Sequence, residues 1–93
     1  MNRLTKQMEE DGFWVVDPAA IRQEKAGFSG EAVDRLAKFE DVYEAILAQQ
    51  ERLNPKLEQM RLEGKNRTYQ FKELTGKKLM NAHLLTLFKN HGL

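Results

Sequence analysis

The stretch that decides the fold is residues 31–63, EAVDRLAKFEDVYEAILAQQERLNPKLEQMRLE. Apolar side chains recur along it at intervals that alternate between three and four residues, with one polar residue in the series. That spacing places all of them on one face of an α-helix, and it follows a heptad repeat over about four heptads. We call this set the seam; its members are Leu36, Phe39, Tyr43, Ile46, Gln50, Leu53, Leu57 and Met60.

The seam predicts that the helix has a partner. At a rise of 1.5 Å per residue, a helix over residues 31–63 is about 50 Å long, which is too long to be buried inside a globule of 93 residues. The helix must therefore bend or pair with a second chain, and we expect a homo-oligomer, with a dimer favoured. Gln50 would fix the register if the seam lies between chains. Val33, Val42 and Leu47 widen the apolar face, which suits a bundle better than a two-stranded rod.

Pro55 leaves two alternatives open for this helix. Inside a helix, a proline removes a backbone hydrogen bond and clashes with the preceding turn, at a cost of about 3 kcal/mol. Asn54 and Pro55 are also a suitable cap and first residue for a new helix. The seam keeps its phase across Pro55, which slightly favours a kinked, continuous helix over a broken one.

Residues 1–30 are predicted to form an N-terminal extension with a short helix. Residues 1–11 have weak helical character, whereas the aromatic and β-branched residues 13–16 favour an extended, strand-like segment. Asp17 and Pro18 are typical of a helix start, as the cap and the first helical residue. Three further residues are expected from their capping chemistry to end or to cap a helix: Gly27, Ser29 and Gly64.

Residues 64–93 are predicted to form a basic helical unit. Two short helices are expected, over residues 71–80 and 82–90, with Asn81 as the cap of the second. Thr68 either caps the first of them or lies in a short strand that pairs with the strand-like segment near the N-terminus. We therefore predict a mainly α fold in one domain. It has a long amphipathic helix, kinked or broken, with short flanking helices in a helical hairpin or bundle, and short strands only as a minor feature.

The composition limits where the protein works. The sequence has no cysteine, which excludes disulfides and thiolate metal sites. No apolar run approaches the roughly 20 residues that a membrane-spanning helix needs, and the polar N-terminus lacks the apolar core of a secretory signal. We expect a cytoplasmic protein with no membrane association.

Charge is distributed unevenly along the chain. Residues 1–63 hold nine Lys or Arg and thirteen Asp or Glu, a net charge of −4, whereas residues 64–93 hold six basic residues and one acid, a net charge of +5. Such asymmetry suggests nucleic-acid binding or acidic-on-basic packing between subunits. Two short helices joined by a tight turn would resemble a helix-turn-helix unit. The phosphate contacts would then come from Lys65, Arg67, Lys72, Lys77, Lys78 and Lys89.

The sequence carries no motif for a specific reaction. It has no phosphate-binding glycine loop, no nucleophile elbow and no histidine pair at metal-ligand spacing. His83 and His91 are too far apart to hold one ion without help, and the acids Glu40, Asp41 and Glu44 are typical of a solvated helix face. We therefore predict no enzyme activity, no catalytic or metal-binding residue, no cofactor and no small-molecule ligand.

Two stretches resemble small phage and prophage proteins. Residues 30–42, GEAVDRLAKFEDV, resemble a stretch of those proteins with an "RLAxYED"-like core, although Phe39 replaces the tyrosine and the chain stays helical where those proteins turn. Residues 64–93 resemble their C-terminal end, through Lys77-Lys78-Leu79, Asn81 and Leu87-Phe88. The resemblance implies a phage-type source and implies no activity.

Two functional hypotheses follow from these patterns. The first is a non-enzymatic, phage-type accessory protein that self-associates through the seam. The alternative is a small nucleic-acid-binding protein that uses the basic, helix-turn-helix-like C-terminal third. The first predicts that Ile46→Glu combined with Leu53→Glu disrupts folding or association. The second predicts nucleic-acid binding that weakens steeply with salt and is lost when Lys77 and Lys78 are replaced by glutamate.

Overall fold

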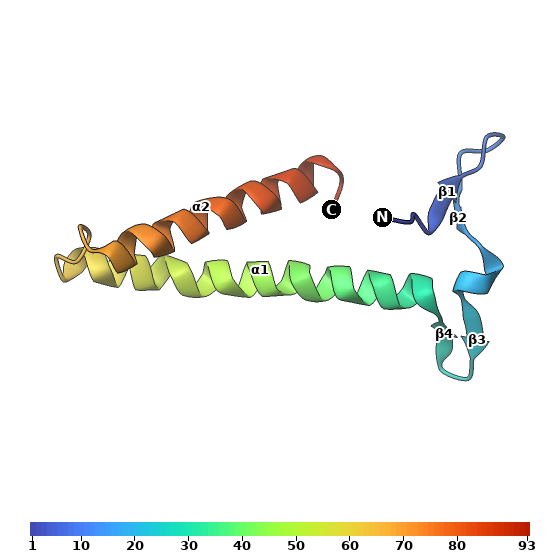
Figure 1. Cartoon of the computed structure of the whole chain (residues 1–93), viewed down its shortest axis with the longest axis horizontal. Coiled ribbons are helices and arrows are strands. Elements are labelled where there is room, and N and C mark those ends of the chain that lie inside the picture. Colours follow the sequence, from blue (N-terminus) through green and yellow to red (C-terminus); the bar gives the residue numbers. More distant parts are fainter. The chain divides into compact units, whose positions relative to one another are not determined.

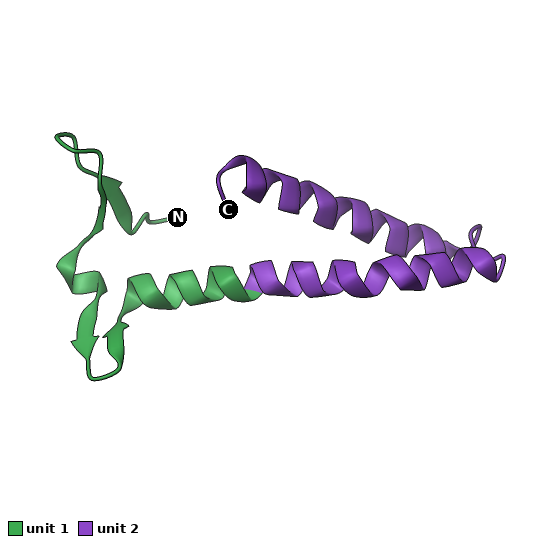
Figure 2. Ribbon diagram, turned by 180° about the vertical axis from the view of Figure 1, so that it is seen from behind, with its two compact units in different colours: residues 1–41 green, residues 42–93 purple.

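The computed structural model describes residues 1–93, which divide into two compact units, Met1–Asp41 and Val42–Leu93 (Figure 2). In chain order the elements are β1 (Thr5–Gln7), β2 (Trp14–Val16), the 3-10 helix η1 (Pro18–Ala20), β3 (Arg22–Glu24), β4 (Gly27–Ser29), α1 (Glu31–Leu62) and α2 (Tyr69–Asn90) (Figure 1). Helix α1 begins in the first unit and ends in the second.

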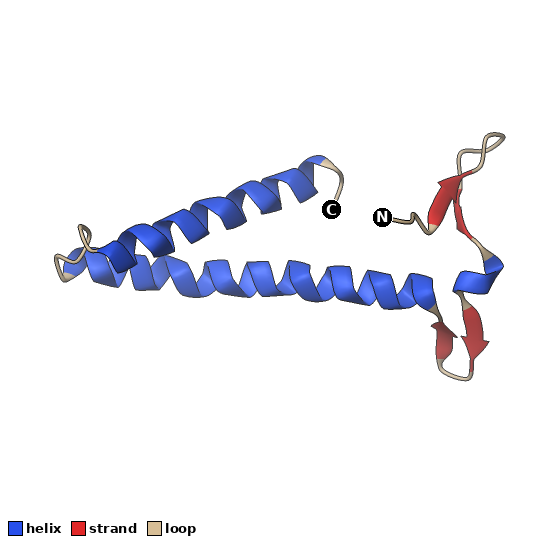
Figure 3. Ribbon diagram, viewed as in Figure 1, coloured by secondary structure: helices blue, strands red, loops and turns tan.

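Strands make up more of the fold than the sequence predicts. The chain is 61% helical and 13% strand, and the strands form two separate antiparallel two-stranded sheets, β1–β2 and β3–β4 (Figure 3). The prediction of a mainly α fold, built as a helical hairpin or bundle with minor strands, is therefore wrong. The reason lies in residues 1–30, where tight turns pair three-residue strands, and no segment is long enough to form a stable helix.

The first hairpin pairs β1 with β2, with Lys6 opposite Val15. Its turn is closed by the Asp11 carboxylate, which accepts a hydrogen bond from the backbone N–H of Phe13 at 3.1 Å. The guanidinium of Arg3 lies 4.7 Å from the centre of the Trp14 ring, within the range of a cation–π contact. A two-stranded hairpin is marginal alone, and these contacts help to hold it.

The first hairpin bears on three predictions, of which one is confirmed and two are wrong. The strand-like interpretation of residues 13–16 is confirmed for Trp14–Val16. The weak helical character of residues 1–11 is not realised, because part of that segment forms β1. The suggested strand at residues 68–71 does not form either, because β1 is the partner of β2 and Thr68 caps a helix.

The predicted helix start at Asp17 is correct, but the helix is only one turn long. The Asp17 carboxylate accepts from the backbone N–H of Ala19 at 2.8 Å, and Pro18 occupies the first turn. The helix ends at Ala20 instead of Gly27, because residues 22–24 and 27–29 pair as β3 and β4. Ser29 lies in β4, where its hydroxyl donates to the Glu24 carboxylate at 3.0 Å.

Gly30 connects the second hairpin to α1 through a close backbone approach. Its φ is +122°, and a Cβ at this position would lie 2.4 Å from the carbonyl oxygen of Ala20, which is itself buried. No side chain other than hydrogen fits there, because the obstructing atom belongs to the backbone. The glycine therefore allows α1 to begin directly against η1.

Replacing Gly30 with alanine is expected to destabilise the Met1–Asp41 unit by about 1–3 kcal/mol, from backbone strain alone, with the steric clash adding to it. Amide hydrogen exchange in β3 and β4 would measure the loss. The matched control is Gly27→Ala, which also has a positive φ (+148°) but would meet nothing within 4 Å. Equal effects from the two variants would contradict the role given to the close approach.

Pro55 lies inside α1, which continues through it without a break (Figure 1). The broken-helix alternative is therefore wrong. The proline costs about 3 kcal/mol in a helix interior, but Leu53 and Leu57 on either side are only 6% and 3% exposed. Burial of a leucine side chain is worth about 1.5–3 kcal/mol, so the packing of these two residues is enough to keep the helix intact.

Both ends of the connection between α1 and α2 follow local capping rules. Gly64, with φ +74°, ends α1 as predicted; its N–H bonds the Arg61 carbonyl at 3.0 Å, and the next N–H bonds the Met60 carbonyl at 2.8 Å. This pair of bonds is a Schellman motif. The Thr68 hydroxyl accepts from the backbone N–H of Phe71 at 3.2 Å, which caps α2.

Helix α2 runs uninterrupted over Tyr69–Asn90, so the prediction of two short helices is wrong. Asn81 does not cap a new helix, because it lies in the middle of α2 with its side chain buried. Within the Val42–Leu93 unit, α1 and α2 run antiparallel (Figure 1). The core sits next to the turn, where Leu57, Met60 and Phe71 form a buried cluster with Leu74 packed against it.

Candidate self-association surface

The seam of α1 changes from buried to exposed along its length. Its last third is buried against α2 of the same chain, whereas its first residue is 57% exposed. Packing within the chain therefore uses part of a surface that the sequence analysis assigned to a second copy. The buried members of the seam are Leu53, Leu57 and Met60. The half-buried members are Phe39, Tyr43, Ile46 and Gln50, and Leu36 is exposed.

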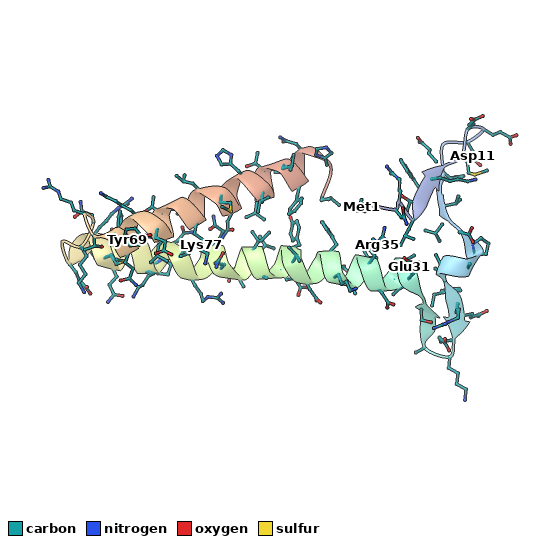
Figure 4. The ribbon with its side chains drawn as sticks, viewed as in Figure 1. Met1, Asp11, Glu31, Arg35, Tyr69 and Lys77 are labelled. Carbon is teal, nitrogen blue, oxygen red and sulfur yellow. The ribbon has the colours of Figure 1, made fainter.

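Helix α2 carries a matching inner face that the sequence analysis did not recognise. Side chains of both helices extend into the space between them (Figure 4), and the Tyr43 and Phe88 rings lie 5.3 Å apart, centre to centre. Lys78 and Asn81 interrupt the apolar pattern of this face, which hides its heptad spacing. We call this set the inner face of α2; its members are Phe71, Leu74, Lys78, Asn81, Leu85 and Phe88, all of them buried or half-buried.

A buried polar layer crosses the pair of helices. The Asn81 amide, only 5% exposed, donates to the side-chain oxygens of Gln49 at 2.7 Å and Gln50 at 3.2 Å. The Gln50 amide in turn donates to the Lys78 carbonyl at 3.1 Å. Gln50 thus has partners in its own chain. Such a layer fixes the register of two helices, because any shift leaves buried amides without partners.

Asn81→Ala is expected to lower the free energy of unfolding by about 1–3 kcal/mol, because the amides of Gln49 and Gln50 lose a buried partner. Urea denaturation would measure the change. Asn90→Ala, at the exposed end of the same helix, serves as the control and should stay within about 0.5 kcal/mol of the wild type. An Asn81→Ala variant as stable as wild type would show that the layer contributes nothing.

A second apolar stripe lies on another side of α2, and most of it is exposed in the single chain, although Leu84 is half-buried. With successive residues about 100° apart around the axis of α2, the members of this stripe fall within an arc of about 80°. The centre of that arc lies about 130° around the helix from the centre of the inner face. Met80 and Leu87 are 63% and 51% exposed. We call this set the outer stripe; its members are Gly76, Met80, Leu84 and Leu87.

The basic residues of the C-terminal third do not share a surface. Lys72, Lys77 and Lys78 are each at least about 100° apart around α2, and Lys78 is half-buried. Lys65 forms an ion pair with Glu63 at 2.9 Å. The remaining members of the predicted phosphate-binding set are Arg67, in the turn before α2, and Lys89, in its last turn. The helix-turn-helix-like unit on which the nucleic-acid hypothesis depended does not form, because α2 is one helix.

In the turn between the helices, the pKa of the Glu63 carboxyl is shifted. The hydrogen bond from Lys65, assisted by that from Gln59 at 3.0 Å, holds the pKa of Glu63 below its ordinary value of 4.5. A carboxyl whose pKa is lowered in the folded state stabilises that state at pH values above the ordinary pKa. This stabilisation is lost as the pH falls through the lowered pKa. The Glu63 side chain is exposed, so screening by solvent keeps the effect small.

Glu63→Gln is therefore expected to lower the free energy of unfolding only slightly near neutral pH. The variant should also lose slightly less stability than the wild type when the solution is made acidic. Urea midpoints of wild type and variant, measured at about pH 6 and again at about pH 3, would show the difference. The gap between the two proteins should narrow at the lower pH. A gap that widens in acid would contradict the assignment of the lowered pKa.

The histidine and acidic side chains do not come together as a metal site. No group of three or more His, Asp or Glu side chains is placed to hold a metal ion. The His91 ring donates through Nδ1 to the Leu87 carbonyl at 2.9 Å, in the last turn of α2. In the first unit, the Arg35 guanidinium donates to the Asn2 carbonyl, so it ties the N-terminus to the start of α1 (Figure 4).

Comparisons with known proteins add no assignment. No protein-family model, curated protein or solved structure matches the chain. Neither α1 nor α2 combines the length and apolar character that crossing a membrane requires. The outer stripe of α2 is therefore the feature of the Val42–Leu93 unit that most needs an explanation.

Proposed function

We propose that this protein is a non-enzymatic, self-associating accessory protein whose helix pair docks on a second copy of the chain. The observation that carries the proposal is that α2 is apolar on two sides. The inner face is packed within the chain, whereas the outer stripe is exposed apart from the half-buried Leu84. A helix that is apolar on both sides is normally buried on both. Met80 and Leu87, at 63% and 51% exposure, are the side chains that a second copy would cover.

The small core supports the same proposal. In the Val42–Leu93 unit the buried apolar side chains are Leu53, Leu57, Met60 and Phe71, and each of them keeps some exposure. Units below about 70–80 residues usually need disulfides, a metal or oligomerisation in addition to their core. The chain has no cysteine, so association with another copy is a natural source of the missing burial.

The cellular setting of the proposal comes from the sequence. We propose a phage-type source for the protein, because residues 30–42 resemble a stretch of small phage and prophage proteins, and we propose that it works in the cytoplasm. In such a role the protein would contribute a surface for assembly, and no residue would carry out a chemical step.

The concentration dependence of thermal unfolding tests the proposal. If folding is coupled to dimerisation, the Tm of the full chain rises with protein concentration by mass action. Circular dichroism across about two decades of concentration would reveal the rise. A Tm that is the same at every concentration, together with a monomeric mass, would rule the proposal out.

A further inference from the structure

We infer that the second copy docks antiparallel on α2, about a two-fold axis near residue 82, with the partner's Leu87 seated over Gly76. The inference rests on the proposed function and gives it a specific geometry. Three observations carry it: a glycine that the fold of the single chain does not need, the order of side chains along the outer stripe, and the placement of charges at its two ends.

Gly76 is an unusual residue for its position. It lies in the interior of α2 and is exposed, and glycine weakens a helix interior relative to alanine. A Cβ added there would meet nothing within 4 Å, and φ is not positive. The fold of the single chain therefore gives no reason for a glycine. A close approach from outside the chain does, because glycine leaves room for an incoming side chain.

The outer stripe is complementary to itself when two α2 helices run antiparallel. With the axis near residue 82, Gly76 of each copy lies opposite Leu87 of the other, so the smallest member faces a large one. Met80 lies opposite Leu84. Alternation of large and small residues across facing positions is what lets two helices interdigitate.

The same arrangement places a carboxylate opposite a histidine at both ends of the interface. Glu73 lies one helical turn before Gly76, and it falls opposite His91 of the second copy. In a parallel pair Glu73 would instead lie beside its own copy, and the repulsion between the two carboxylates favours the antiparallel direction.

Like charges are kept apart in this geometry. At 1.5 Å per residue, the two copies of Lys77 would be about 15 Å apart along the axis, and those of Lys72 about 30 Å. Both distances exceed the Debye length of about 8 Å at physiological salt. In a parallel pair each lysine would instead lie beside its own copy. Gly76 would face Gly76, and the two glycines would leave a gap where the antiparallel pair has a contact.

Single cysteines give a direct test, because the natural chain has none. In the antiparallel pair, the two copies of residue 83 would be about 3 Å apart along the axis, so His83→Cys should form a disulfide-linked dimer on mild oxidation. Ala82→Cys is the matched control, since it lies at the same height on α2, is also exposed, and points about 155° away from the outer stripe, so it should not cross-link. Gly76→Cys copies would be about 18 Å apart, and they should cross-link only when mixed with Leu87→Cys.

The outcomes separate the geometry from the proposed function. Cross-linking of His83→Cys, and of the Gly76→Cys and Leu87→Cys mixture, is the expected result. Rapid cross-linking of Gly76→Cys alone, in a chain that light scattering shows to be a dimer, would overturn the antiparallel arrangement and leave self-association intact. A monomeric mass for the full chain at every concentration would overturn both.

Gly76→Ala provides a second test that does not depend on oxidation. The variant should raise the Tm of dilute protein, because alanine is the better helix former and meets no atom of its own chain. It should also weaken dimerisation at least about tenfold, since the added methyl occupies the place of the partner's Leu87. Dimerisation as tight as that of the wild type would overturn the proposed contact.

Discussion

Phe71→Ala is expected to lower the free energy of unfolding of the helix pair by about 3–5 kcal/mol. Phe71 is 8% exposed and belongs to the buried cluster with Leu57 and Met60. The Arg61 guanidinium also lies 5.6 Å from the centre of its ring. A change of this size is a large fraction of the total stability of a small protein, which is typically about 5–15 kcal/mol.

Urea denaturation of Phe71→Ala and of a control would measure this effect. Tyr69→Ala is the matched control, because it removes an aromatic side chain from the same turn of α2, where Tyr69 is 82% exposed. Its effect should stay within about 0.5 kcal/mol. If the two variants lost similar stability, the core would not lie where the structure places it.

The double variant Met80→Glu, Leu87→Glu is expected to weaken association at least about a thousandfold, which corresponds to about 4 kcal/mol. Each carboxylate would have to lose water on entering an apolar interface, where no partner awaits it. The monomer should keep its fold, because both side chains are mostly exposed within the chain. Circular dichroism would check the fold, and light scattering would give the mass.

The control for the double variant lies on another side of the same helix. Leu79→Glu combined with Thr86→Glu adds the same two charges to exposed positions of α2 that are outside the outer stripe. This control should associate like the wild type. Loss of association in both double variants would point to the added charge, and retention in both would place the interface elsewhere.

The sequence was most informative where a pattern was long. The seam runs over about four heptads, so its periodicity predicts α1 well, and Gly64 marks the end of the helix because a positive φ is needed there. The phase of the seam across Pro55 pointed correctly to a continuous helix. Pattern alone did not reveal that α2 of the same chain covers part of the seam, because Lys78 and Asn81 interrupt the matching face.

The sequence was least informative where tertiary contacts overrode a local preference. Asn81 is a good helix cap by residue type, yet it lies inside α2 because its amide is needed by Gln49 and Gln50. Of the strands in residues 1–30, only β2 was predicted, and β1, β3 and β4 were missed for a different reason. Three residues carry too little periodicity to identify a strand, so these hairpins depend on their turns.

The sequence predicted the type of candidate surface, an apolar helix face, but not its position on α2. The length of α1 and its apolar seam led to the prediction of self-association through the seam, whereas the surface proposed here is the outer stripe of α2. The outer stripe of α2 has the same residue types without a long repeat, and it became recognisable only when the exposure of Met80 and Leu87 was known. The unused space over Gly76 has no signature in the sequence at all.

Sedimentation equilibrium of the full-length protein tests the central claim most directly, because it measures the mass of the particle in solution without reference to shape. Self-association through α2 predicts a mass that approaches twice the 10.8 kDa of one chain as concentration rises, and one that stays near a single chain for Met80→Glu, Leu87→Glu. A wild-type mass of one chain throughout the concentration range would contradict the account.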